Sequence, residues 1–253
     1  MGRPIPPSPE GQHRHAYHRE LDKLDTDVLR LGAMVCETIP RGTQILLGGD
    51  LKEAQSLIDA DDAIDELSIL VEEDCYSIIA RQAPKAGELR HIITVSKLVA
   101  ELERSADLMV NICKSSRRMY GAPLSPQIRG LIASMSTEAN RLMRYALDAF
   151  ADEDVSMAVA LSDIDDTLDQ LNRDMVGAIF AAHSEDMIDL GVAVQLALIS
   201  RYYERIGDHA VNIGERVAYM VTGWLPEHNG ALREQHRTGR SSGLGTDRPH
   251  EDE

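Results

Sequence analysis

Apolar side chains recur at alternating steps of four and three residues from Tyr17 to about residue 222. The first such series comprises Tyr17, Leu21, Leu24, Val28, Leu31 and Val35. Residues with this spacing fall on one face of an α-helix, so the pattern predicts amphipathic helices that pack through that face. Proline and glycine collect at a few junctions instead of recurring every ten residues, which argues against an all-β fold.

The junctions divide the chain into predicted helices and tails. The first helix begins near residue 13, and Pro40 and Gly42 are expected to interrupt or kink it. Further helices are predicted at residues 50–82, 87–119, 127–150, 154–183 and 186–222, with a linker at residues 120–126. Residues 1–12 and 223–253 carry no apolar period, so both terminal segments are expected to be disordered.

Two sequence motifs occur twice, in the same order and roughly 100 residues apart. The matching stretches are DADDAIDEL at 59–67 with DIDDTLDQL at 163–171, and ELERSADLMVNI at 101–112 with YYERIGDHAVNI at 202–213. Recurrence of both at nearly the same offset indicates an internal duplication. The predicted fold class is therefore all-α, with two tandem, sequence-related three-helix bundles over residues 13–119 and 127–222.

Four of the predicted helices each carry two acids spaced four residues apart, and the first acid of each pair lies in the apolar stripe. The pairs are Asp61 and Asp65, Glu103 and Asp107, Asp165 and Asp169, and Glu204 and Asp208. Like charges at this spacing lie one above the other on a helix and repel. Residues 50–79 hold ten acids and one base, and residues 148–174 hold nine acids and one base, so the negative charge is concentrated in two corresponding helices.

Three interpretations of the acid pairs are open. The acids lie on a solvated face or pair with Arg104 and Arg205, each of which follows a motif glutamate. Alternatively, each bundle holds a multinuclear cluster of transition-metal or divalent cations, such as iron, manganese or zinc, whose charge offsets the cost of burying carboxylates. A di-iron oxidase site needs two ExxH motifs, whereas the clear ExxH here, Glu88 to His91, lies away from the acids.

The roles of three polar residues near the acid pairs are not fixed by the sequence. Asn111 and Asn212 follow the last acid of two pairs by four residues. They either extend the ladder as neutral oxygen ligands or hydrogen-bond the carboxylates. His209 directly follows Asp208, and since neighbouring helical residues point about 100° apart, we expect it to face solvent.

Charge and composition exclude several classes of protein. The formal net charge of −16 repels phosphate backbones, so no nucleic-acid partner is expected. Cys36, Cys75 and Cys113 are odd in number and outside any CxxC motif, as expected of reduced thiols in a cytoplasmic protein. No uncharged run reaches the ~18 residues of a membrane span. No phosphate loop, nucleophile elbow or zinc motif occurs in the sequence, so we expect a soluble cytoplasmic protein that is not an enzyme.

Over nearly all of residues 17–222, the chain resembles the PhoU family, accessory regulators of phosphate-specific transport. The resemblance rests on HRELDKLDTDVLRLGAMV, RQAPKAGELRHIITVSKLVAELERSAD and YYERIGDHAVNI, the last of which is highly specific. Two features depart from the family. The first-half motif reads ERSAD where the family usually has ERIGD, and Pro40 to Gly42 fall in a helix that is commonly continuous.

The resemblance implies both a fold and a function. Two similar three-helix bundles would each bind a metal cluster through the acid pairs identified above. Such proteins are negative regulators of phosphate uptake and of the phosphate-starvation response. They act between the ATPase subunit of a phosphate ABC transporter and a phosphate-sensing histidine kinase, and associate only peripherally with these membrane complexes. A homodimer is expected. The alternative is a metal-storage or metal-dependent redox protein built on the same bundles.

Overall fold

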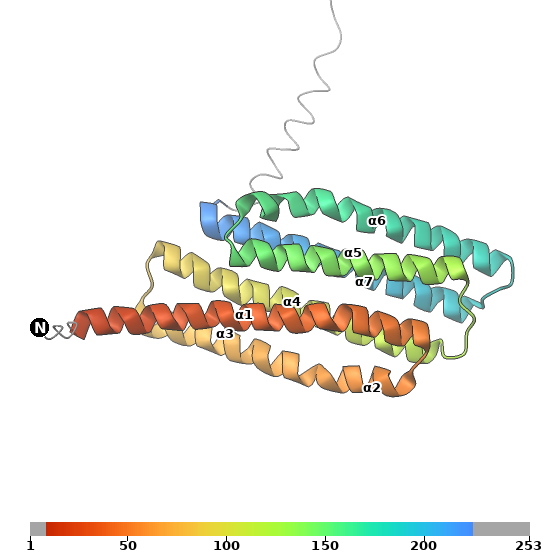
Figure 1. Cartoon of the computed structure of the whole chain (residues 1–253), viewed down its shortest axis with the longest axis horizontal. Helices are drawn as coiled ribbons and strands as arrows, with labels where there is room; N and C mark the ends of the chain where they lie inside the picture. The colour runs from red at the N-terminus through yellow and green to blue at the C-terminus, as the bar shows by residue number, and fades with distance from the viewer. Residues whose placement is uncertain (1–8, 225–253) are drawn as a thin grey trace, which may run out of the picture.

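The computed structural model describes residues 9–224, and every regular element in this range is a helix (Figure 1), which confirms the predicted all-α class. The helices are α1 (Pro9–Gly48), α2 (Leu51–Ala60), α3 (Asp62–Gln82), α4 (Ala86–Arg118), α5 (Pro126–Ala151), α6 (Val155–Ser184) and α7 (Leu190–Thr222). They run roughly along the long axis, with α1–α4 on one side and α5–α7 on the other (Figure 1). The two halves meet where α4 contacts α7 and α1 contacts α5.

Most predicted helix boundaries agree with the structure. α4, α5 and α6 begin and end within one residue of their predicted limits. α7 begins later, at Leu190, because Asp189 caps it by accepting a hydrogen bond from the Val192 N–H. Residues 9–12 were predicted within the first tail but belong to α1. Pro9 can begin the helix because the N–H groups of the first turn have no hydrogen-bond partner within the helix, so the N–H that proline lacks is not needed there. Residues 1–8 and 225–253, most of the two predicted tails, lie outside the described residues.

The predicted interruption at Pro40 is wrong, because α1 continues through Pro40 to Gly48. A proline inside a helix removes one backbone hydrogen bond and crowds the preceding turn. Packing retains the helix here: Gly42 is buried, and its missing side chain leaves room for Met109 of α4. Contacts with another helix therefore outweigh a local signal that would end α1.

The helix predicted at residues 50–82 is divided at Asp61 into α2 and α3. Asp61 keeps helical backbone angles (φ −64°, ψ −31°), but its N–H lies 3.4 Å from the Ile58 carbonyl oxygen, three residues back. This is the pairing of a 3₁₀ turn, which tightens the chain locally. The two halves begin this element in the same way. Asp50 caps the N-terminus of α2 and Asp154 caps that of α6, and each side chain accepts hydrogen bonds from two following N–H groups.

A continuous hydrophobic core extends through both halves. A buried polar contact joins three helices across it: Thr43 Oγ1 of α1 lies 2.7 Å from Ser136 Oγ of α5 and 2.7 Å from Tyr203 Oη of α7. Tyr203 is fully buried, so these partners replace the water that its hydroxyl loses on folding. The contact holds α7 in place at the residue before Glu204. Among residues 9–224, no helix combines the length and apolar character that a membrane span requires.

α6 and α7 approach closely at two glycines of α7. A Cβ atom at Gly214 would lie 2.7 Å from the Ala158 carbonyl oxygen, and one at Gly207 would overlap Asp165 and Leu168. Both positions thus require the absence of a side chain. The second of them places the backbone of α7 directly against an acid of α6.

Replacing Gly214 by alanine should destabilise the protein by about 1–3 kcal/mol, because the added methyl group has to displace the backbone of α6. The matched control is Gly177→Ala on α6, which is exposed and has open space around its Cα. That change should be neutral or stabilise by up to about 1 kcal/mol, since alanine favours the helix. Urea unfolding followed by circular dichroism measures both. Equal effects of the two substitutions would contradict the close approach of α6 and α7.

Candidate functional site

The four motif acids of the second half lie on the facing sides of α6 and α7. Asp165 and Asp169 belong to α6, and Glu204 and Asp208 belong to α7. Burial and then the charges of Asp169, Asp208 and Glu204 raise the pKa of Asp165 to about 7. Neighbouring carboxylates shift a pKa in this way only at short range, so the structure brings the four acids into one group.

Gly207 makes the approach of Asp165 to α7 possible, because a Cβ atom there would overlap Asp165 Oδ1. Asp165 Oδ1 is buried and has no hydrogen-bond partner among the described residues. Glu204 Oε2 is also buried without a well-oriented hydrogen bond, although Arg201 Nη1 forms an ion pair with it. Leaving a buried carboxylate oxygen unpaired is costly. A proton or a cation at this position would therefore stabilise the folded chain.

The first-half acids form a looser group between α3 and α4. Asp61 lies at the break before α3 and Asp65 within α3, while Glu103 and Asp107 belong to α4. Burial and then the charges of Asp65, Asp107 and Glu103 raise the pKa of Asp61 to about 6. Asp65 and Asp107 are exposed, and Ala106 takes the place that Gly207 has in the second half. The ERSAD motif, which lacks the glycine of ERIGD, thus belongs to an acid group that is more exposed to solvent than the second-half group.

The chemistry of both groups suits a metal ion, since carboxylate oxygens are preferred ligands of hard divalent cations. In residues 9–224, however, no three Asp, Glu, His or Cys side chains converge closely enough to hold an ion as they stand. The second half fits better than the first, because Asp165 Oδ1 is buried there without a hydrogen-bond partner, held against α7 at Gly207. The ligand assignment of the eight acids stays a prediction.

The arginines that the sequence suggested as partners do not pair with the motif acids. Arg104 lies 3.6 Å from Glu101 Oε1, and Arg205 forms no ion pair within the described part of the chain. The ion-pair partner is Arg201, which sequence reasoning missed: it pairs with Glu204 and lies 3.9 Å from Asp208 Oδ2. Its position three residues before Glu204, on the same helical face, is the signal that could have identified it.

Glu88 and His91, the clear ExxH of the sequence, have structural partners away from the acid pairs. The Lys85 N–H donates to Glu88 Oε2 over 3.0 Å at the start of α4. His91 Nε2 lies 2.7 Å from Asp25 Oδ1 on α1. These contacts account for both residues without a di-iron site.

The three cysteines are free and buried, as the sequence predicted. Burial raises the pKa of the Cys36 and Cys113 thiols to about 11 and that of Cys75 to about 12. A thiol with such a pKa stays protonated at neutral pH and is a poor nucleophile. Burial therefore disfavours the reactive thiolate form of all three.

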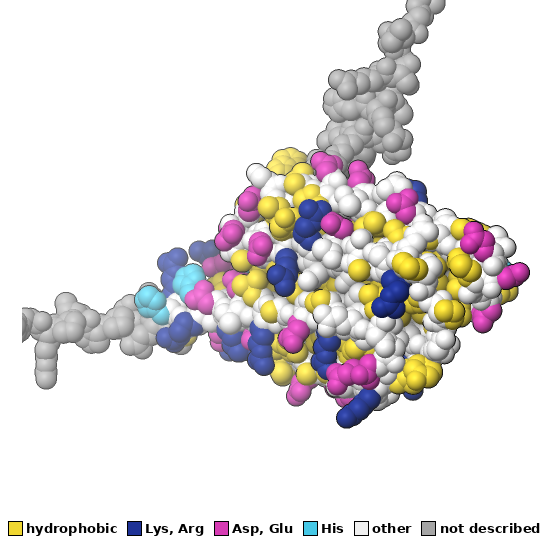
Figure 2. Space-filling view, turned by 45° about the vertical axis from the view of Figure 1, so that its right-hand side comes forward, with side chains coloured by type: hydrophobic (Ala, Val, Ile, Leu, Met, Phe, Trp, Pro, Cys, Tyr) yellow, Lys and Arg dark blue, Asp and Glu magenta, His cyan; other side chains and the backbone are white. Residues whose placement is uncertain are grey.

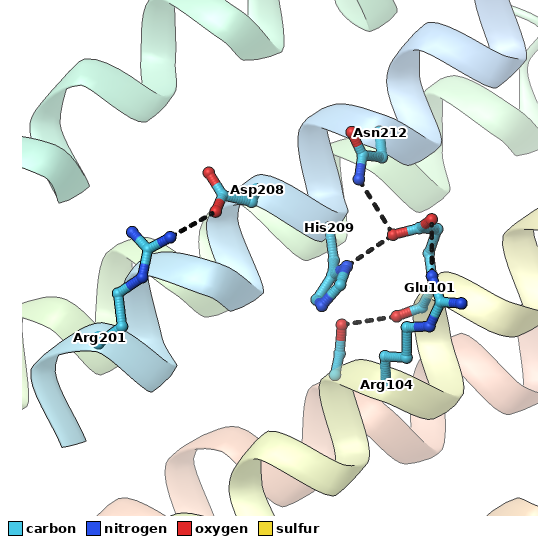
Figure 3. A network of polar contacts seen from close by, with 7 residues as sticks. Glu101, Arg104, Arg201, Asp208, His209 and Asn212 are labelled. Atoms are coloured by element: carbon cyan, nitrogen blue, oxygen red, sulfur yellow. Dashed lines mark hydrogen bonds and ion pairs between the residues drawn. The ribbon is translucent and has the colours of Figure 1, made fainter. Parts of the chain in front are cut away.

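Glu101 of α4 joins the two halves through contacts with α7 (Figure 3). Its Oε2 lies 2.6 Å from His209 Nδ1 and accepts a hydrogen bond of 3.1 Å from Asn212 Nδ2, both on α7. The expectation that His209 faces solvent is wrong, because α4 covers that side of α7 and His209 is buried. Asn212 hydrogen-bonds a carboxylate, but not one of the motif acids. In Figure 3, Arg201 and Asp208 lie on a different side of α7 from His209.

Ionisation of Asp165 should make the metal-free protein less stable at high pH. Its pKa of about 7 in the folded chain exceeds the ordinary value of 3.8, so the folded state binds this proton more tightly than the unfolded state does. Stability is therefore lost as pH rises from about 4 to about 7, and the loss is complete above that range. In chelator-treated protein, Asp165→Asn should raise the urea midpoint more at pH 8 than at pH 5.

The matched control for this prediction is Asp163→Asn, which removes the same charge from an exposed position on the same helix. Its effect should differ little between the two pH values. An Asp165→Asn effect of the same size at pH 5 and pH 8 would contradict the buried position of Asp165.

Comparison with known proteins places both halves in one family. The sequence profile described as the PhoU domain matches residues 28–116 and 132–217. The chain is 33% identical over 214 residues to phosphate-specific transport system accessory protein PhoU homolog 1 of Mycobacterium tuberculosis, covering 84% of this chain and 96% of that protein. Its identity to PhoU homolog 1 of Thermotoga maritima is also 33%, over 211 residues that cover 83% of this chain and 90% of that protein.

Solved structures show the same architecture. PhoU from Pseudomonas aeruginosa matches with a TM-score of 0.77 and 29% identity, covering 82% of this chain and 100% of that chain. The phosphate transport system regulatory protein PhoU from Streptococcus pneumoniae matches with a TM-score of 0.76 and 26% identity, covering 83% of this chain and 98% of that chain. Because the family profile matches both halves and relatives are 33% identical over most of the chain, this protein belongs to the PhoU family.

Proposed function

We propose that this chain is a cytoplasmic regulator of phosphate homeostasis, which restrains phosphate uptake and the phosphate-starvation response when phosphate is plentiful. The observation that carries the proposal is the family match over both repeats. The relative from M. tuberculosis is named as an accessory protein of phosphate-specific transport, and the structure from S. pneumoniae as a regulatory protein of phosphate transport.

The proposed mode of action is that of an adaptor, not an enzyme. The chain would contact the ATPase subunit of a phosphate ABC transporter and a phosphate-sensing histidine kinase, associate peripherally with these membrane complexes, work as a homodimer and bind no nucleic acid. Its surface supports protein contacts: hydrophobic side chains lie among acidic ones at the end where α6 connects to α7 (Figure 2). Phe180, Met187 and Leu190 are exposed in this region. Groups of exposed hydrophobic residues often mark binding surfaces.

A metal-bound state is the second part of the proposal. Each bundle would hold one multinuclear cluster of iron, manganese or zinc. The residues that would hold the clusters are Asp61, Asp65, Glu103 and Asp107 in the first half, and Asp165, Asp169, Glu204 and Asp208 in the second. When bound, the cations would supply the positive charge that offsets repulsion among these carboxylates. The buried Asp165 oxygen without a hydrogen-bond partner, and the close approach of Asp165 to α7 at Gly207, support this assignment for the second half.

A metal-storage or redox function on the same bundles is the less favoured alternative. The relatives described above are named for phosphate transport and its regulation, not for storage or redox chemistry. Turnover of an oxidisable substrate by the iron- or manganese-loaded protein would favour the alternative. Binding to a kinase or a transporter without turnover would favour the regulator.

Purified protein prepared without chelator should contain more than one metal ion per chain. Glu204→Ala/Asp208→Ala should remove roughly half of this metal and leave the first-half site occupied, because the two acid groups lie on separate helix pairs. The variant should also lose the part of the metal-induced rise in Tm that comes from the second site. Elemental analysis and thermal unfolding measure these effects.

The matched control for the metal assignment is Asp163→Ala/Glu215→Ala, which removes two exposed acids of α6 and α7 outside the motifs. It should retain the full metal content. Unchanged metal in Glu204→Ala/Asp208→Ala would refute the ligand assignment. Less than about a tenth of an equivalent per wild-type chain after reconstitution with iron, manganese and zinc would refute the metal proposal altogether.

Deleting the gene should turn on phosphate-starvation genes in phosphate-rich medium, because the proposed regulator favours the silent state of the kinase. Transcript levels of these genes, with and without a plasmid copy of the gene, provide the measurement. The Glu204→Ala/Asp208→Ala variant should restore at least part of the repression, since partner contact is proposed to use other helical surface. Starvation genes that stay silent in the deletion strain would sink the regulatory proposal.

A further inference from the structure

Arg201 brings a positive charge to both α7 acids of the second-half group. It lies about one helical turn before Glu204, and its Nη1 pairs with Glu204 Oε2. Its Nη2 lies 3.9 Å from Asp208 Oδ2, and Figure 3 shows the guanidinium directed toward this carboxylate. The Arg201 side chain is 54% exposed, so it reaches these acids from the solvent-facing side of the group.

The first half has no counterpart of this arginine. Alignment of the repeated motifs places Ala100 where the second half has Arg201. A groove of about 370 Å³ opens at this point between α3 and α4, and its lining includes Ala100, Glu103, Asp65 and Glu72. Two of the first-half motif acids, Asp65 and Glu103, therefore line an open, acidic groove, whereas the equivalent position of the second half carries the Arg201 cation.

A guanidinium that pairs with a carboxylate supplies the same charge that a bound cation would supply. Arginine stays protonated at all physiological pH values, so a change in pH does not remove this charge. A metal ion and the guanidinium repel each other and compete for the negative charge of Glu204 and Asp208, so the presence of one weakens the binding of the other. The exposed side of Arg201 faces solvent, which leaves a direction in which the side chain can move away.

We propose that Arg201 is a built-in counter-ion that competes with metal for Glu204 and Asp208. The second-half site then takes up a cation only as Arg201 moves into solvent, and it binds that cation more weakly than the same acids would alone. The first-half site has Ala100 at this position, and although Lys114 and Arg104 lie near enough to act on Asp61 and Glu103, neither forms an ion pair with a motif acid within residues 9–224. The inference rests on the metal binding proposed above and makes the two sites of one chain differ in a defined way.

The test is titration calorimetry of Mn²⁺ into the chelator-stripped full-length chain. The first-half site is removed by Glu103→Ala/Asp107→Ala so that the second-half site is measured alone. In this background, Arg201→Gln should tighten Mn²⁺ binding by at least about tenfold, because a full charge next to the ligands is removed. The matched control is Arg205→Gln, which removes an exposed charge adjacent to Glu204 that forms no ion pair within residues 9–224. It should change the affinity less than about twofold.

A reciprocal variant tests the first-half site. With the second-half site removed by Glu204→Ala/Asp208→Ala, Ala100→Arg should weaken Mn²⁺ binding by about tenfold, because it introduces the competing charge. Circular dichroism and Tm in the presence of chelator check that each variant folds like its background.

The outcomes separate the inference from the metal proposal. Mn²⁺ that binds the second-half site with the same affinity in the Arg201→Gln variant and its background would overturn the counter-ion role and leave the metal assignment standing. Equal tightening by Arg201→Gln and Arg205→Gln would overturn it as well, since net charge alone would then explain the effect. Failure of Mn²⁺ to bind either background would overturn the metal assignment and, with it, the role of Arg201.

Discussion

Mutual repulsion among carboxylates at a helix interface is the constraint on which the rest of this structure depends. Removing a carboxylate from water disfavours its charged form, and each further negative charge nearby adds to the cost. The raised pKa values of Asp61 and Asp165 express both effects. Folding therefore requires that a proton, a cation or solvent offset the repulsion at each acid group. The packing of α6 on α7 and of α3 on α4 is compatible with the acids only under this condition.

The two halves meet this constraint in different ways, although they descend from one repeated unit. In the second half, Gly207 admits Asp165 into the interface, and Arg201 pairs with the acids of α7. In the first half, Ala106 occupies the position of the glycine, Asp65 and Asp107 reach solvent, and Asp65 lines an open groove. The duplication preserved the acids themselves, while the residues around them diverged. The two groups thus present the same ligands to different local charge and hydration.

Helix α7 connects the second-half group to the remainder of the molecule on several sides. Toward α6 it presents the motif acids and two glycines, and toward α4 it presents His209, which contacts Glu101. Tyr203, the residue before Glu204, meets Thr43 and Ser136 in the core. A displacement of α7 at one of these contacts has to be accommodated at the others, because close-packed interiors leave little free volume. The contact of Glu101 with α7 also places the first-half motif, two residues further along α4, next to the interface between the halves.

The sequence by itself determined the helical class, the internal repeat and the acid pairs, because these features are local. The apolar spacing of a helix can be read without knowing its neighbours, so the limits of α4, α5 and α6 were predictable to within one residue.

Only the tertiary structure decided which helix faces contact each other. Packing against Met109 keeps α1 continuous through Pro40, and contact with α4 buries His209. The pairing of Arg201 with motif acids depends on where its flexible side chain can reach, which helical spacing permits but does not require. These outcomes depend on contacts between side chains, most of which belong to different helices. The periodicity of apolar residues along the chain does not determine which side chains meet, so it could not predict these contacts.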